Sequence, residues 1–176
     1  PVQRLTTHRR KVGTADFHPC ANNVLATTAT DPGVKIWDIE AGKELFSNGD
    51  AHKDIIQGFS WNGNGSLGCT SSKDKTLRVL DPRQNTVAQQ KEEAHMGVKG
   101  FRALWLNKPK DYIFTVGFSK TSERQYALWD PKDLSKPLKL TGIDNASGLI
   151  MPFYDNDTCV LYLAGKGDGN IRYFEV

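Results

Sequence analysis

The chain has 176 residues, of which 38% are hydrophobic and 24% are charged, and its formal net charge is +3 at pH 7. No apolar run approaches the roughly 18 residues of a membrane-spanning helix, and the polar N-terminus lacks the pattern of a secretory signal. The small charge excess does not by itself indicate nucleic-acid binding. The composition predicts a domain with an ordinary core, and the missing initiator methionine suggests a piece of a longer chain.

Short apolar segments alternate with turn-forming residues along the whole chain, which predicts an all-β protein. Residues 1–7 are expected to form the outer strand of a preceding unit. Three repeats are expected to follow, and a degenerate, incomplete one ends the chain. Their predicted bounds are 8–50, 51–93, 94–141 and 142–176.

A similar string ends the third predicted strand of each repeat: VKIWD (34–38), LRVLD (77–81), YALWD (126–130) and IRYFE (171–175). The aromatic or leucine position of this string recurs at steps of 43, 49 and 45 residues, and histidines recur at steps of 44 and 43. A period of about 40–45 residues with a terminal Trp-Asp is typical of the four-stranded blades of WD-repeat β-propellers. We therefore predict a partial WD-repeat β-propeller of about four blades.

An acidic residue stands six positions before each terminal aromatic or leucine. Buried carboxylates and imidazoles are tolerated only when they are paired. We therefore expect a loop histidine, a strand hydroxyl, the turn acid and the tryptophan to form a hydrogen-bonded chain where a repeat supplies them. The fourth repeat has neither the histidine nor the tryptophan. Leu80 replaces the tryptophan in the second repeat, and Trp37, Trp129 and Phe174 are expected to be buried. The expected members of the network are His8, Asp31, Trp37, His52, Ser72, Asp74, Glu123, Trp129 and Asp168.

Three cysteines, Cys20, Cys69 and Cys159, lie about 50 and 90 residues apart in or beside apolar segments. An odd number with no metal-ligand spacing argues against a disulfide framework and against a zinc site. Free cysteine in such positions behaves as a small hydrophobic residue. A reducing, cytoplasmic setting is the expectation.

No motif predicts catalysis, a metal or a cofactor. The glycine-rich segment 165–169 lacks the ending of a phosphate-binding loop and precedes a strand, so we interpret it as a tight turn. The four histidines show no metal-ligand spacing, and no nucleophile-elbow pattern occurs. Asp155 and Asp157 lack the other positions of a calcium-binding loop. The chain is therefore expected to be non-catalytic and to bind no cofactor.

Several longer strings are similar to the blades of coronins. They cover residues 17–38, 60–83, 115–134 and 148–176, and GFSKTSERQ and GKGDGNIRYFE are more specific than any Trp-Asp pair. Membership of that family implies a seven-bladed propeller that binds filamentous actin and regulates the actin cytoskeleton. Actin-regulatory proteins and an anionic membrane surface are further candidate partners, and no nucleic-acid partner is expected. About four of seven blades are expected here, with no C-terminal coiled coil.

The geometry of a blade places the loop before its first strand and the turn between its second and third strands on one face. Basic residues recur at these positions, and they are candidates for binding an acidic partner such as an actin filament. The alternatives are a scaffold for a different protein complex and a phosphoinositide-binding surface. The candidates are Arg9, Arg10, Lys11, Lys53, Lys73, Lys75, Lys120, Arg124 and Lys166.

Overall fold

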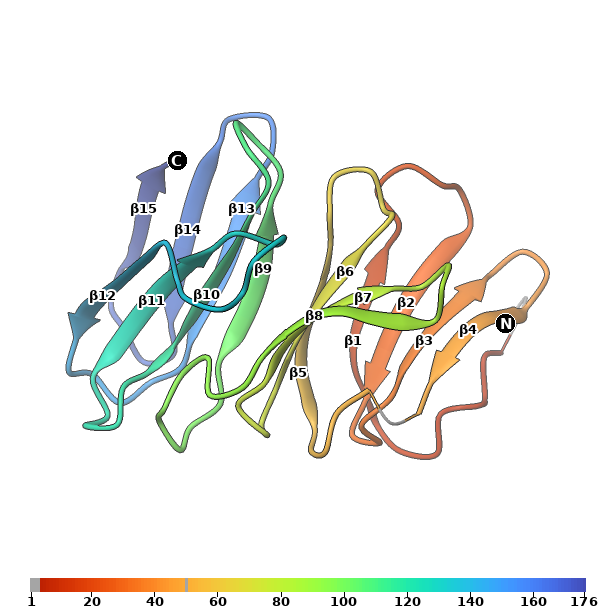
Figure 1. Cartoon of the computed structure of the whole chain (residues 1–176), viewed down its shortest axis with the longest axis horizontal. Helices are drawn as coiled ribbons and strands as arrows, with labels where there is room; N and C mark the ends of the chain where they lie inside the picture. The colour runs from red at the N-terminus through yellow and green to blue at the C-terminus, as the bar shows by residue number, and fades with distance from the viewer. Residues whose placement is uncertain (1–3, 50) are drawn as a thin grey trace.

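A computed structural model describes residues 4–49 and 51–176, which form four antiparallel β-sheets standing in a row (Figure 1). Sheet I contains β1 (Val12–Phe17), β2 (Val24–Ala29), β3 (Val34–Asp38) and β4 (Lys43–Asn48). Sheet II contains β5 (Ile56–Trp61), β6 (Gly68–Ser72), β7 (Leu77–Asp81) and β8 (Thr86–Lys91). Sheet III contains β9 (Arg102–Leu106), β10 (Tyr112–Phe118), β11 (Arg124–Trp129) and β12 (Lys139–Asp144). Sheet IV contains β13 (Ile150–Asp155), β14 (Val160–Gly165) and β15 (Ile171–Glu175).

The strands of each sheet are hydrogen-bonded in chain order, and every pair is antiparallel. The first strands of successive sheets contact one another, β1 with β5, β5 with β9 and β9 with β13. The sheets therefore radiate from a common side, as the blades of a propeller do. This arrangement confirms the prediction of a partial all-β propeller with about four blades.

Apolar side chains fill the three interfaces between neighbouring sheets. Ile36 and Phe46 of sheet I pack with Phe59 and Trp61 of sheet II. Cys69 and Val79 of sheet II lie in one cluster with residues of sheet III that include Trp105 and Trp129. Phe114 and Val116 of sheet III pack with Leu161 and Leu163 of sheet IV. Each interior sheet is thus buried on both faces, and the hydrophobic effect holds the row together.

The outer face of sheet IV differs from its inner face. Leu161 pairs with Phe174 across β14 and β15, and Leu161 lies in the core shared with sheet III. Because side chains alternate between the faces of a strand, the neighbouring row of Phe153, Tyr162 and Tyr173 points away from sheet III. These three rings are 56%, 39% and 72% exposed. The row of sheets therefore ends in an apolar face.

The aspartate of the repeated Trp-Asp pair has a local structural role. Asp38 accepts hydrogen bonds from the backbone N–H groups of Glu40 and Ala41, each at 3.0 Å. Asp81 and Asp130 accept equivalent bonds in the turns that follow β7 and β11. A carboxylate at this position satisfies backbone donors that a tight turn leaves unpaired. The motif therefore ends the third strand and begins the turn to the fourth.

The predicted outer strand at residues 1–7 is only partly covered by the structure. Residues 1–3 lie outside the described residues, and residues 4–7 form no strand. Instead, the Thr7 hydroxyl donates to Glu44 Oε2 of β4 at 2.5 Å, so this segment runs against sheet I. Across residues 4–49 and 51–176, no helix is long and apolar enough to cross a membrane.

Candidate partner-binding rim and the network beneath it

Backbone hydrogen bonds hold the loops on one rim of the molecule together, and the same contact recurs in three of the four sheets. In sheets I, II and IV, the residue after the second strand donates its N–H to the carbonyl of the residue before the first strand, as Thr30 does to Lys11 at 2.9 Å. In sheet III a different bond joins the loop before the first strand to the end of the second strand, from Gly97 N–H to Phe118 O at 2.8 Å. We call the segments 8–11, 51–55, 92–101 and 145–149 the approach loops. With the turns 30–33, 73–76, 119–123 and 166–170 they form the lower rim in Figure 1.

Sheet I contains a complete hydrogen-bonded chain beneath this rim. His8 Nδ1 lies 3.1 Å from Asp31 Oδ1, and His8 Nε2 lies 2.8 Å from the hydroxyl of Thr27. Trp37 Nε1–H donates to the same hydroxyl at 2.7 Å. His8 Nδ1–H therefore donates to the carboxylate, and the Thr27 hydroxyl donates to Nε2 while it accepts from Trp37. The chain ties the approach loop, the turn, β2 and β3 into one unit.

Sheet II repeats the chain without its last member. His52 Nδ1 lies 3.1 Å from Asp74 Oδ2, and His52 Nε2 lies 2.7 Å from the Thr70 hydroxyl. Leu80 donates nothing, so Thr70 has one side-chain partner where Thr27 has two. Burial lowers the pKa of His52 to about 4 despite the opposing charge of Asp74. The imidazole is therefore neutral at neutral pH, and its tautomer is fixed by these two bonds.

The expected role of Ser72 in this chain was wrong, because Thr70 is the residue that contacts the histidine. Thr70 stands where Thr27 stands in β2, four residues before the turn acid. Ser72 lies at the end of the strand. Its hydroxyl donates to Asp54 O and accepts from the N–H of Asp74, so it orders the approach loop and the turn.

Sheet III builds the chain with a neutral residue in the acidic position. His95 Nε2 lies 2.9 Å from the Thr115 hydroxyl, which accepts from Trp129 Nε1–H at 2.8 Å. His95 Nδ1 lies 3.1 Å from Gln125 Nε2. Glu123, which we expected here, is exposed and lies over Gly142 of β12. The longer turn of this repeat moves Glu123 away from the histidine and brings Gln125 to it. Burial alone lowers the pKa of His95 to about 4.

Asp168 belongs to a different network that connects sheets III and IV. The Arg124 guanidinium donates to both carboxylate oxygens of Asp144, at 2.5 and 2.6 Å, and to both of Asp168, at 3.1 and 3.0 Å. Arg172 donates to the same two aspartates at 2.7 and 3.3 Å. Hydrogen bonding by Arg124 holds the pKa of Asp144 at about 2, and the two carboxylates raise the pKa of Arg124. We call these four residues the arginine–aspartate quartet.

The quartet corrects the proposed role of Arg124 in partner binding. The residue is 1% exposed, and its planar guanidinium is occupied by two carboxylates. It is therefore unavailable to a partner unless the interface between sheets III and IV opens. Lys75 is also less available to a partner, because its Nζ donates to Met96 O at 3.0 Å and the residue is half-buried.

The remaining basic candidates are exposed on the lower rim. Lys53 and Lys73 project from sheet II, and Lys120 and Lys166 project from the turns of sheets III and IV. The others lie together in the first approach loop. Acidic side chains that would offset their charge are partly occupied, since Asp31 and Asp74 bind histidines and Asp168 binds arginines. The exposed members on the rim are Arg9, Arg10, Lys11, Lys53, Lys73, Lys120 and Lys166.

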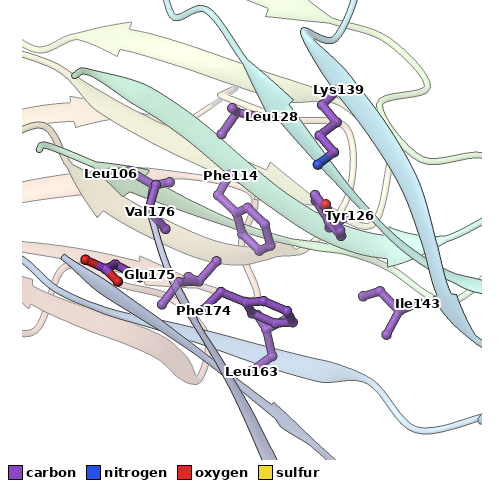
Figure 2. A pocket seen from close by; sticks show the side chains of 11 residues that line it. Leu106, Phe114, Tyr126, Leu128, Lys139, Ile143, Leu163, Phe174, Glu175 and Val176 are labelled. Atoms are coloured by element: carbon purple, nitrogen blue, oxygen red, sulfur yellow. The ribbon is translucent and has the colours of Figure 1, made fainter. Parts of the chain in front are cut away.

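The prediction that Phe174 is buried is wrong, because this side chain is 48% exposed. It occupies the position of Trp37 and Trp129, and Figure 2 shows its ring beside Leu163 and across from Phe114 and Tyr126. The pocket between them has a volume of about 270 Å³ and is mainly apolar. In the described chain sheet IV has three strands where its neighbours have four, so no fourth strand covers β15. The ring therefore remains open to solvent on one side.

All three cysteines are free thiols, and Cys69 is fully buried, which raises the pKa of its thiol. His18 is structural as well. Its Nδ1 accepts from the N–H groups of Cys20 and Ala21, so its Nε2–H donates to Gly65 O of the next sheet at 3.1 Å. Within residues 4–49 and 51–176, no three His, Cys, Asp or Glu side chains are grouped to hold a metal ion.

The repeated sheets and their histidine–threonine–tryptophan chains define the class of WD-repeat β-propellers. Residues 1–38 and 43–81 match the family described as "WD domain, G-beta repeat". The sequence is 46% identical to "Coronin-like protein crn1" of Schizosaccharomyces pombe and 42% identical to "Coronin-2A" of Homo sapiens, over 99% of the chain in both cases. The WD40 domain of Toxoplasma gondii coronin superposes with a TM-score of 0.94 at 31% identity, also over 99% of the chain.

Within that class, the chain is a homologue of the coronins. It spans 29% of the fission yeast relative, 33% of the human relative and 45% of the Toxoplasma chain. The resemblance found in the sequence strings is thereby confirmed at the level of the family.

Proposed function

We propose that this chain is part of a non-catalytic, coronin-type scaffold that binds actin filaments in the cytoplasm. The observation that carries the proposal is homology to coronins over 99% of the chain. The exposed basic residues of the lower rim support it, because a positively charged surface attracts an acidic protein partner such as an actin filament.

The use of the polar side chains supports a scaffold and not an enzyme. All four histidines are held by hydrogen bonds that join loops to strands or sheets to one another. The acid–histidine pairs are closed by a threonine hydroxyl inside the sheet, so each histidine is held from both ring nitrogens. Their chemistry is to orient the approach loops, and oriented loops on a rigid β-scaffold are a common basis for protein binding.

The direct test is co-sedimentation of the complete protein containing this chain with actin filaments, over a series of salt concentrations. Binding that weakens as salt rises is expected, because exposed charges are screened over about 10 Å at 0.1 M salt. Absence from the filament pellet at low salt would overturn the proposal. Retention on vesicles containing phosphoinositide, without filament binding, would assign the basic rim to a membrane surface instead.

A further inference from the structure

Three apolar side chains are exposed at the centre of the lower rim. Ile55 in the approach loop of sheet II is 37% exposed, and Met96 and Val98 in that of sheet III are 43% and 88% exposed. Exposed rings such as Tyr173 lie on the free face of a terminal sheet. Val98 differs, because its loop joins sheets II and III, and both of these have a neighbour on each side. Its exposure is therefore a property of the rim itself.

Ile55 and Met96 flank one turn, and Val98 follows two residues after Met96. Lys73 N–H donates to Ile55 O at 2.9 Å on one side of the turn 73–76. On the other side Lys75 Nζ donates to Met96 O, and Ala94 N–H donates to Lys75 O, both at 3.0 Å. Ile55 and Met96 are thus fixed at the two sides of a turn that carries lysines. We call Ile55, Met96 and Val98 the apolar centre of the rim.

The loop that carries Met96 and Val98 is anchored on both sides of its tip. Gly97 is buried and donates to Phe118 O, and a Cβ at Gly97 would lie 2.4 Å from the Phe118 side chain. After the tip, Lys99 Nζ donates to Ser147 O at 2.6 Å. Gly100 then lies against the end of the Gln57 side chain. A loop held in this way presents Val98 without a large entropy cost on binding.

We propose that the apolar centre is where the acidic protein partner of the rim makes its closest contact, and that this partner is the actin filament of the proposed function. The inference rests on that function. Apolar residues at the middle of an interface, ringed by polar ones that exclude water, contribute much of the binding energy. Here the exposed Lys53 and Lys73 are polar neighbours of Ile55.

The surrounding charges favour a protein over a lipid surface. Glu92 and Glu93 are exposed in the same approach loop as Val98, and Asp54 precedes Ile55. These acids alternate with the lysines along the rim. A uniformly anionic bilayer would repel them, whereas a protein surface can place a basic group opposite each one.

The contact is tested by Met96→Ser together with Val98→Ser in the complete protein. The matched control is Val87→Ser with Leu140→Ser, which removes two apolar side chains exposed on the outer strands β8 and β12. Both double variants should melt as the unaltered protein does. The rim variant should bind actin filaments about tenfold more weakly through faster dissociation, with an unchanged salt dependence, while the control should bind normally.

The outcomes separate this inference from the proposed function. If the unaltered protein does not bind filaments, the proposed function fails and takes this partner with it. If the unaltered protein binds but the rim variant and the control have equal affinity, the apolar centre is not the contact and the inference alone fails. Loss of binding to phosphatidylserine vesicles by the rim variant, with filament binding intact, would also overturn it, because the centre would then be a membrane contact.

Discussion

At the scale of single residues, the threonine hydroxyl is the centre of each buried chain. Thr27 serves both His8 and Trp37, whereas Thr70 serves His52 alone. A buried polar group that loses its partner costs about 1–3 kcal/mol. The number of side-chain partners therefore decides how much each hydroxyl contributes to stability.

This difference predicts which of two threonine substitutions lowers the free energy of unfolding more. Thr27→Val leaves two buried nitrogens unpaired and should lower the free energy of unfolding by about 2–4 kcal/mol, whereas Thr70→Val leaves one and should cost about 1–3 kcal/mol. Urea denaturation of the complete protein measures both. Thr27→Ser keeps the hydroxyl and serves as the control. A Thr70→Val variant less stable than Thr27→Val would show that the chains do not contribute in this way.

The histidines predict a loss of stability in mild acid. Burial lowers the pKa values of His52 and His95 to about 4, below the value of about 6.5 in an unfolded chain. Between these two values the unfolded state binds more protons than the folded state, so stability is fully present above pH 6.5 and falls as the pH approaches 4. Each histidine should account for up to about 3 kcal/mol.

Thermal melts at pH 7.0, 6.0 and 5.0 measure this effect. His52→Gln should flatten the dependence in this window while lowering stability at pH 7. The control is Val87→Ser, an exposed change that keeps both buried histidines and should leave the slope unchanged. Melting temperatures independent of pH from 7.0 to 5.0 would contradict the burial of neutral imidazoles.

Some members of the hydrogen-bonded chains could be predicted from the sequence, and others could not. Spacing alone brought together His8, Asp31 and Trp37 in one repeat. A threonine four residues before the acid recurs at Thr27 and Thr70, so the correct hydroxyl could have been found by aligning the second strands. Counting back from Trp129 failed in the third repeat, because its longer turn separates Glu123 from the histidine. The approach of Gln125 to His95 is a consequence of tertiary packing that residue spacing does not encode.

At the scale of elements, the arginine–aspartate quartet is the main polar connection between sheets III and IV. Its members come from β11, the end of β12, the turn 166–170 and β15. The sequence showed Arg124 only as one basic residue among several, because its partners are 20 and 44 residues away. No local pattern distinguishes a buried, doubly paired arginine from an exposed one. The structure was needed for that distinction.

Removal of the central guanidinium should loosen sheet IV. Arg124→Met leaves Asp144 and Asp168 with Arg172 alone, and we expect a loss of about 2–4 kcal/mol, because removing one partner of a buried ion pair is costly and the aspartates stay partly hydrated. Hydrogen exchange should increase in β13–β15 more than in sheets I and II. Lys120→Met, an exposed change on the adjacent turn, is the control. Uniform exchange in both variants would show that the quartet does not join the sheets.

At the scale of the whole molecule, the predicted fold class was confirmed because the period, strand lengths and turn residues all agreed. A propeller blade is a repeated unit whose core lies between neighbours, so the pattern survives the loss of single positions such as Leu80. The rim is less accessible from sequence. Lysines could be assigned to loops, but their exposure, the burial of Arg124 and the apolar centre depend on packing between sheets.

The central claim is that the lower rim is the surface that binds the filament. Reversing Lys53, Lys73, Lys120 and Lys166 together to glutamate in the complete protein tests it most directly, because all four are exposed and outside the quartet. The control reverses Arg83, Lys108, Lys110 and Lys132, which are exposed in loops on the opposite rim. At low salt the lower-rim variant should bind actin filaments at least about tenfold more weakly than the control, with most of the loss in the association rate. Equal affinities of the two variants would contradict the account.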